Sequence, residues 1–268
     1  MKKLVSLILT AAIALGITAC GSKSDDKTVT VAATSAPHAE VLEQCKPLLK
    51  EKGYDLVIKV VDDYITPNTA TEDGEVDANY FQHINYLNNF NAENGTHLVN
   101  IANVHYEPFG VYSSKLKSLS ELKNGDSIAV PNDPTNEARA LLLLAENGVI
   151  KLTEGVGIKA TKKDIIENPK NIKINEMEAA LLPSVLDEVT CAVINGNYAI
   201  AAGLKIADAI AVENSESVAI KQEYVNILVV KEGNEDLPKI KALKEVLTSD
   251  EIAKYITDNY DGAVVPMK

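Results

Sequence analysis

The sequence predicts an α/β fold in which two lobes enclose a ligand cleft. Two observations carry this prediction. A strand–helix–strand pattern occupies residues 29–61, and a similar alternation of strands and helices restarts after Pro108. Each pattern runs for about 100 residues, which is enough for one α/β lobe. Clefts for small molecules are common between two such lobes.

The N-terminal residues are typical of an exported lipoprotein. Lys2 and Lys3 precede an uncharged run over residues 4–19, and Cys20 follows it. The run is shorter than a spanning helix, which needs about 20 apolar residues, and it fits a secretory signal peptide. Residues 17–20 (ITAC) resemble the bacterial lipobox, whose cysteine is acylated and becomes the new N-terminus. The alternatives are an ordinary signal peptide and an unusually short anchor helix.

We therefore predict a signal peptide over 1–19, a lipidated tether over 20–27, and a protein anchored through Cys20 on the extracytoplasmic face of the cell membrane. Loss of residues 1–19 removes two lysines and no acid, so the net charge changes from −12 to −14. Such a chain is not expected to bind nucleic acid, because that binding depends on neutralising phosphates. Cys45 and Cys191 lie in a predicted helix and a predicted strand. A disulfide between them and two buried free thiols both stay open.

The first lobe begins with a βαβ unit, which implies a parallel sheet. Residues 29–33 form a strand, a turn at 35–38 starts a helix that runs to Lys52, and 54–61 form the next strand. Two further strands are predicted at 75–81 and 98–104, with an aromatic and asparagine-rich segment between them.

The rest of the chain continues the alternation. We predict short helices at 119–122 and 164–168, helices at 136–147 and 177–186, strands at 127–130, 172–175, 191–194 and 224–230, and a closing helix pair over 237–260.

One arginine stands out among the basic residues. Of 26 lysines and arginines, only Arg139 is an arginine, and it lies in the first turns of a helix that follows a strand end and a proline-containing turn. Helix N-termini attract carboxylates, and a guanidinium can close a planar bidentate fork on one. We therefore predict that Arg139 binds a ligand carboxylate. A chance arginine on a helix surface is the alternative.

An aromatic cluster is the second candidate feature. Its members lie within 23 positions of one another and are Tyr64, Tyr80, Phe81, His83 and Tyr86. Aromatic rings line small-ligand pockets, and they make favourable contacts with thioether sulfur. A lobe core with scattered tyrosines remains the alternative for any one of these residues.

Metal and catalytic sites are not predicted. The four histidines, His38, His83, His97 and His105, have spacings that match no standard ligand pattern. The sequence also contains no GxSxG elbow, no HExxH and no phosphate-cradling glycine loop. We therefore expect a protein that is not an enzyme and carries no cofactor or metal.

Long motifs along almost the whole chain resemble the NlpA/MetQ family of methionine-binding lipoproteins, the substrate-binding components of ABC importers. They cover about residues 28 to 265, and they are PHAEVLE (37–43), DYITPN (63–68), DANYFQH (77–83), VHYEPFGVYS (104–113), VPNDPTNEARALLLL (130–144), ENPKNIKI (167–174), VINGNYAI (193–200) and YVNILVV (224–230).

The resemblance implies a periplasmic-binding-protein (type II-like) fold, with two lobes joined by two crossings. Lobe I would span 28–110 plus 219–268 and lobe II 111–218. It also implies that a monomer binds L-methionine, D-methionine or a methionine-containing dipeptide by hinge closure and docks on an ABC permease/ATPase complex. A surface adhesin or interaction lipoprotein with the same fold, or a binding protein for another small amino-acid compound, is the alternative.

Site residues follow from the resemblance by position. Arg139 matches the arginine that holds the ligand carboxylate, and Asn136 lies one helical turn before it. Asn195 and Asn226 match asparagines that bind polar backbone groups of the ligand. The pocket around the ligand side chain would be formed by Tyr64, Phe81, His83 and Tyr86, and Tyr106 and Glu107 lie near the first crossing.

The chain departs from the family pattern at four positions: Thr71, Asn85, Ser184 and Glu223. Asn85 and Glu223 neighbour predicted pocket residues, so they bear on which ligand is bound more than on whether one is bound.

Overall fold

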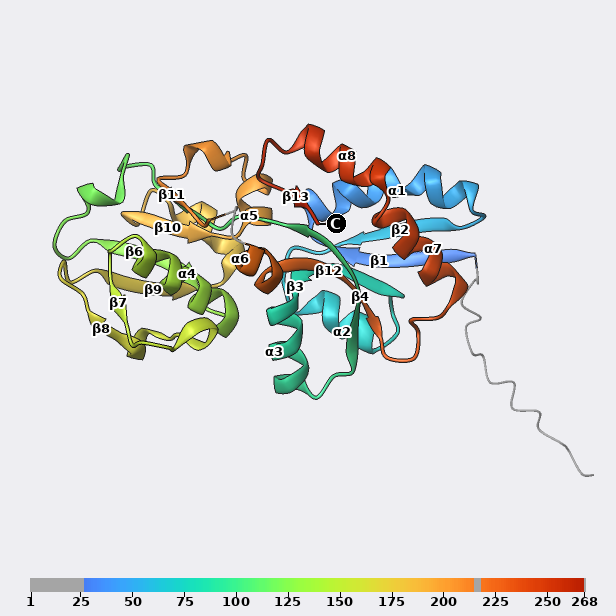
Figure 1. Cartoon of the computed structure of the whole chain (residues 1–268), viewed down its shortest axis with the longest axis horizontal. Coiled ribbons are helices and arrows are strands. Elements are labelled where there is room, and N and C mark those ends of the chain that lie inside the picture. Colours follow the sequence, from blue (N-terminus) through green and yellow to red (C-terminus); the bar gives the residue numbers. More distant parts are fainter. Residues whose placement is uncertain (1–26, 215–217, 268) are drawn as a thin grey trace, which may run out of the picture.

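Two large β-sheets organise the chain, one in each lobe, and the lobes lie side by side along the long axis of the molecule (Figure 1). The structure is a computed structural model and describes residues 27–214 and 218–267. The predicted signal peptide, the lipidation site Cys20 and most of the tether therefore lie outside the described residues. Within the described ranges, no helix has the length and apolarity needed to cross a membrane.

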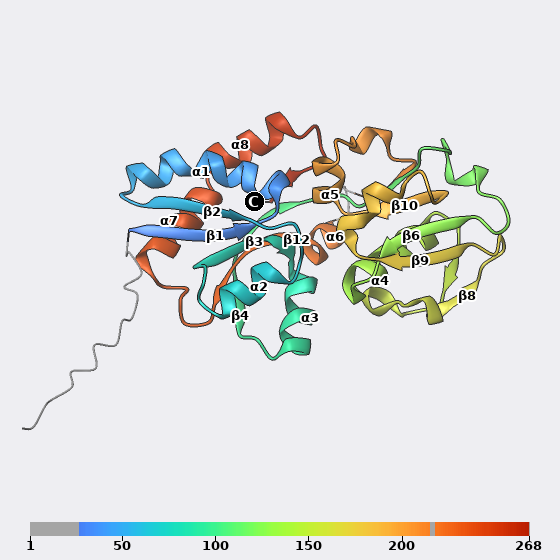
Figure 2. The ribbon, with the colours of Figure 1, turned by 180° about the vertical axis from the view of Figure 1, so that it is seen from behind.

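The first lobe is built from both ends of the chain. Its elements are β1 (Thr28–Ala33), η1 (Ser35–Ala39), α1 (Glu40–Glu51), β2 (Asp55–Val60), α2 (Thr66–Glu72), β3 (Ala78–His83), α3 (Ile84–Asn94), β4 (Leu98–Tyr106), β12 (Val225–Lys231), α7 (Pro238–Leu247), α8 (Asp250–Asn259) and β13 (Val265–Pro266). The strands form one sheet in the order β13-β4-β12-β3-β1-β2. Helices α1, α7 and α8 cover one face of this sheet, and α2 and α3 cover the other (Figures 1 and 2).

The predicted βαβ unit is confirmed, because β1 pairs in parallel with both β2 and β3. The sheet as a whole is mixed, since β12 runs antiparallel between β3 and β4. Strand β12 follows the second lobe in sequence and enters the first-lobe sheet from that side. In the part of the chain that the structure describes, no crossover helix connects it to β3 or β4, so it can run antiparallel to both.

The second lobe holds the middle of the chain. Its strands are β5 (Gly110–Tyr112), β6 (Ser127–Pro131), β7 (Lys151–Leu152), β8 (Ile165–Glu167), β9 (Lys173–Met177), β10 (Cys191–Ile194) and β11 (Ala211–Val212). Its helices are α4 (Pro134–Glu146) and α5 (Gly196–Ala201), with short 3-10 turns η2 (Leu119–Glu121), η3 (Gly157–Lys159), η4 (Lys162–Asp164), η5 (Ala179–Val185) and η6 (Ile206–Asp208). The main sheet has the order β11-β5-β10-β6-β9, and α6 (Val218–Glu223) leads back to the first lobe.

Two sequence predictions differ from the structure in this lobe. The helix predicted at 164–168 is wrong, because these residues enter β8, which pairs antiparallel with β7. The Asp164 carboxylate accepts hydrogen bonds from the backbone and hydroxyl of Thr161, which closes η4 before the β-branched pair Ile165–Ile166 begins. The helix predicted at 177–186 is the shorter 3-10 turn η5, which contains Pro183 and so lacks one backbone donor.

The aromatic and asparagine-rich segment between the predicted strands forms helix α3, for which the sequence pattern predicts no helix or strand. Its N-cap is His83, which accepts a hydrogen bond from the backbone N–H of Tyr86. Cys45 and Cys191 are both buried free thiols in the structure, one in α1 and one in β10.

Candidate functional site

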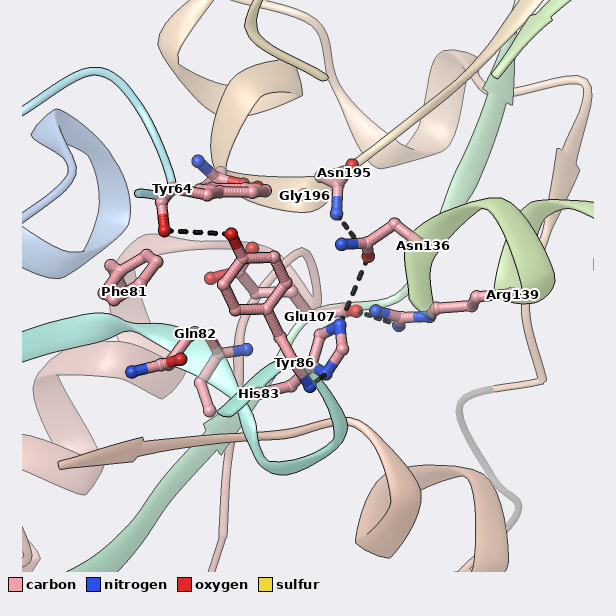
Figure 3. Close-up of a pocket in the computed structure, with 12 residues that line it drawn as sticks. Tyr64, Phe81, Gln82, His83, Tyr86, Glu107, Asn136, Arg139, Asn195 and Gly196 are labelled. Atoms are coloured by element: carbon pink, nitrogen blue, oxygen red, sulfur yellow. Dashed lines mark hydrogen bonds between the residues drawn. The ribbon is translucent and has the colours of Figure 1, made fainter. Parts of the chain in front are cut away.

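A narrow cavity lies between the lobes and is lined from both of them (Figure 3). All eight residues predicted as ligand-binding line it: Tyr64, Phe81, His83, Tyr86, Asn136, Arg139, Asn195 and Asn226. The remaining lining residues are Gln82, Glu107, Gly196 and Asn197.

Arg139 is buried on α4 and already has a carboxylate partner in the protein. The N-cap Asp133 and Pro134 start this helix where β6 ends, and Arg139 follows within its first two turns. Its Nε and Nη2 donate to the two carboxylate oxygens of Glu213 at 3.0 and 2.5 Å, and Nη2 also donates to the carbonyl oxygen of Glu107. Although burial opposes the charge, Glu213 raises the pKa of Arg139.

The pairing with Glu213 occupies Nε and Nη2 of the guanidinium. Nη1 forms no hydrogen bond with any residue in the described parts of the chain, so it keeps its bonding capacity. The ring of Tyr224 lies 4.1 Å from Cζ of Arg139, and the ring of Phe109 lies at 4.8 Å. These rings hold the guanidinium plane by cation–π contact. Sequence analysis missed Glu213, although a single buried arginine requires a negative partner.

Asn136 is the centre of a saturated hydrogen-bond network. Its Nδ2 donates to both carboxylate oxygens of Asp133, and its Oδ1 accepts from His83 Nε2 at 3.2 Å and from Asn195 Nδ2 at 2.8 Å. Figure 3 shows His83 and Asn195 approaching the Asn136 side chain from opposite sides. Asn136 therefore orients its neighbours and has little bonding capacity left for a ligand.

The same network fixes the state of His83. Its Nδ1 accepts from the backbone N–H of Tyr86, so Nε2 carries the proton that is donated to Asn136. Burial lowers the pKa of His83 to about 3, and the positive charge of Arg139 acts in the same direction. His83 is thus a neutral, oriented side chain in the cavity wall.

The aromatic wall belongs to the first lobe. The ring of Tyr64 lies 5.8 Å from that of Phe81 and 5.6 Å from that of Tyr86, measured between centroids. The Tyr86 hydroxyl donates to the carbonyl oxygen of Tyr64, and the Tyr64 hydroxyl donates across the lobes to Asn197 Oδ1 at 2.6 Å. The rings form an apolar surface whose hydroxyls are already bonded.

Behind this wall, His38 and His105 meet the carboxylate of Glu107. One ligating atom from each of the three residues lies within 4.8 Å of the others, a convergence that the sequence spacings did not predict. Glu107 Oε1 accepts from His105 Nε2 at 2.7 Å, and His38 Nε2 contacts Asn226 Oδ1 at 3.1 Å.

The hydroxyls of Thr34 and Tyr80 bond to Nδ1 of His38 and His105 respectively. All four ring nitrogens therefore have hydrogen-bond partners, and the cluster is a complete network that orients Glu107 and Asn226 towards the cavity. Burial lowers the pKa of His38 to about 4 and that of His105 to about 3, whereas it raises the pKa of Glu107.

The two-lobed fold, with a polar and aromatic cavity between the lobes, defines a protein of the periplasmic-binding-protein class. Residues 29–268 match the family model of the NlpA lipoproteins, and the chain belongs to this family.

The methionine-binding lipoprotein MetQ of Bacillus subtilis is 45% identical over 276 residues, which cover 100% of this chain and 99% of the relative. The D-methionine-binding lipoprotein MetQ of Escherichia coli K12 is 40% identical, covering 94% of this chain and 93% of its own length. The structure of a nutrient binding protein from Burkholderia cenocepacia bound to methionine is 41% identical, with a TM-score of 0.85, and covers 90% of this chain and 100% of that one.

Proposed function

We propose that this chain is the methionine-binding component of an ABC importer, anchored through Cys20 on the extracytoplasmic face of the membrane. It would act as a monomeric carrier without catalytic activity. The observation that carries the proposal is the cavity itself, which combines aromatic rings on one side with Arg139 and asparagine amides on the other. An amino-acid zwitterion with a thioether side chain matches both sides. The names of the relatives support methionine as the ligand.

We further propose that Arg139 Nη1 and Asn226 hold the ligand carboxylate and that Tyr64, Phe81, His83 and Tyr86 enclose its side chain. Asn136 would act by orienting His83 and Asn195. Because His38 bonds to Asn226 Oδ1, the Nδ2 of Asn226 is the end left to donate to a ligand oxygen.

Binding by hinge closure is part of the same proposal. The lobes would be 28–110 plus 219–268 and 111–218. The membership of the two large sheets supports this division except at Gly110, which is the first residue of β5 in the second-lobe sheet. Hydrogen bonds cross between the lobes from Tyr64 to Asn197 and from Tyr198 to the carbonyl oxygen of Asp62. These bonds form only when the lobes meet, so they favour a closed form that traps the ligand.

Isothermal titration of the mature chain tests this function. Residues 20–268 with Cys20→Ser would be unfolded and refolded to remove carried ligand, then titrated with L-methionine, D-methionine and glycyl-methionine. We expect binding of at least one compound, and loss of that binding in Arg139→Ala. Lys254→Ala is the matched control, since that side chain is 75% exposed in α8. Absence of heat with all three compounds would refute the proposal.

A larger ligand has one observation in its favour. A second cavity of about 400 Å³ adjoins the first and shares Tyr64 and Tyr86 with it. A methionine-containing dipeptide could extend into this space. Mass spectrometry of the ligand that copurifies with the untreated protein would distinguish a dipeptide from free methionine.

A further inference from the structure

Two asparagine side chains in the cavity wall each have one buried atom without a partner. Among side-chain atoms of the described residues, Asn195 Oδ1 and Asn197 Nδ2 are fully buried and accept or donate no hydrogen bond. Both residues line the cavity, and they are 6% and 3% exposed. A buried polar atom without a partner is destabilising, so such atoms in a cavity wall indicate a ligand that satisfies them.

The opposite end of each amide is held in place. Asn195 Nδ2 donates to Asn136 Oδ1 at 2.8 Å, which leaves Oδ1 as the free end of that amide. Asn197 Oδ1 accepts from the Tyr64 hydroxyl at 2.6 Å, which leaves Nδ2 as the free end. The two residues flank Gly196 at the beginning of α5 and line the cavity, so this short segment holds one free acceptor and one free donor in the cavity wall.

We propose that Asn197 is a specificity-determining residue whose Nδ2 donates a hydrogen bond to an acceptor on the ligand. Tyr64 is the positioning residue that orients the Asn197 amide. This inference rests on the proposed function and deepens it, because methionine offers acceptors in its carboxylate and its thioether.

The orientation of Asn197 depends on closure of the lobes. Tyr64 lies two residues before α2 in the first lobe, and Asn197 lies in α5 of the second. When the lobes separate, the Tyr64 hydroxyl no longer bonds to Asn197 Oδ1, and the Asn197 amide is free to rotate. Recognition of the ligand acceptor is therefore coupled to closure, because the same contact that joins the lobes turns Nδ2 towards the ligand.

Titration of the mature chain with L-methionine tests the role of Asn197. In Asn197→Leu the side chain keeps its size and loses the donor, and we expect the Kd to rise about tenfold or more. Tyr64→Phe should also weaken binding, and the double variant should bind no worse than Asn197→Leu alone, because Tyr64 acts through the amide.

Tyr198→Phe is the matched control. It removes another tyrosine hydroxyl bond between the lobes, to the carbonyl oxygen of Asp62, without touching either asparagine amide. Its effect on the Kd should add to that of Asn197→Leu. Additivity of Tyr64→Phe with Asn197→Leu would contradict the positioning role of Tyr64.

The ligand acceptor is a carboxylate oxygen or the thioether sulfur, which is a weaker acceptor. L-Norleucine separates them, because it replaces the sulfur by a methylene group. Equal losses for methionine and norleucine in Asn197→Leu assign the carboxylate. A loss for methionine alone assigns the sulfur.

A Kd for methionine in Asn197→Leu within twofold of the parent chain would overturn the inference. If that variant fails to fold, Asn197→Asp keeps the acceptor for Tyr64 and removes the donor, and unchanged affinity there has the same meaning. A parent chain that binds no methionine refutes the proposed function instead, so the two failures are distinguishable.

Discussion

The two walls of the cavity differ in how their polar atoms are used. On the first-lobe wall, the Tyr86 hydroxyl and both ring nitrogens of His83 are bonded to other protein groups. On the second-lobe wall, at the beginnings of α4 and α5, Arg139 Nη1, Asn195 and Asn197 keep bonding capacity. The free polar atoms are therefore concentrated on the second wall, and on the first wall Asn226 in β12 is the residue to which we assign a hydrogen bond with the ligand.

The charged part of the second wall should give the largest effect. In Arg139→Ala, Glu213 becomes a buried carboxylate without its partner, and we expect the free energy of unfolding to fall by about 3–5 kcal/mol. Chemical denaturation measures this loss. The double variant Arg139→Met, Glu213→Leu should recover the stability and still bind no methionine. Recovery of binding as well would contradict the role of the guanidinium.

The network that joins the walls comes next. In Asn136→Ala, the donors His83 Nε2 and Asn195 Nδ2 lose their shared acceptor, so we expect a loss of about 1–3 kcal/mol in unfolding free energy. Weaker methionine binding should accompany it. The control is Asn124→Ala, an exposed residue whose loss should change stability by less than about 0.5 kcal/mol. A stable Asn136→Ala with unchanged affinity would show that the walls are independent.

Acid should destabilise the first wall through its neutral histidines. Burial lowers the pKa of His83 to about 3, whereas an unfolded histidine titrates near about 6.5. Between these values the unfolded chain binds a proton that the native protein does not, so stability falls as the pH falls. His83→Gln should reduce the slope of unfolding free energy between pH 6 and 4.5 by about 1.4 kcal/mol per pH unit.

The corresponding control is His97→Gln, because the His97 side chain is 68% exposed. The raised pKa of Glu107 makes stability fall as the pH rises above the ordinary pKa of a glutamate, which is opposite to the effect of His83. This contribution is present in both variants, so it cancels when their slopes are compared. An unchanged slope in His83→Gln would mean that His83 is protonated in the native protein.

The smallest effect should come from an aromatic hydroxyl. Tyr86→Phe loses one hydrogen bond, to the carbonyl oxygen of Tyr64, and keeps the ring contacts. We expect a loss of about 0.5–1.5 kcal/mol in unfolding free energy and little change in the Kd for methionine. A large change in affinity would show that the Tyr86 hydroxyl also takes part in recognition of the ligand.

Local signals explain what could be predicted from sequence. The junction that places Arg139 depends on a strand end, the cap Asp133 and Pro134, all within a few residues of one another. The alternation of strands and helices predicted the lobes, and the eight predicted site residues line one cavity. The choice of methionine came from the family resemblance and not from the residue pattern.

Contacts distant in sequence explain what could not be predicted. Glu213 pairs with Arg139 across 74 positions, and it is one of 38 acidic residues. His38 and Glu107 converge only because β4 and η1 are brought together by the fold. The free ends of Asn195 and Asn197 depend on which partner holds the other end of each amide. No local pattern specifies these distances.

Gly196 sits where α5 meets the linker that carries Glu107. A Cβ atom at this position would lie 2.7 Å from both Cβ and Oε2 of Glu107. The absence of a side chain at this position therefore allows the two lobes to close fully. We expect the added methyl group in Gly196→Ala to hold the lobes slightly apart in a protein that is still well folded. Such a protein would show whether an importer distinguishes a loaded carrier by its shape or by its cargo.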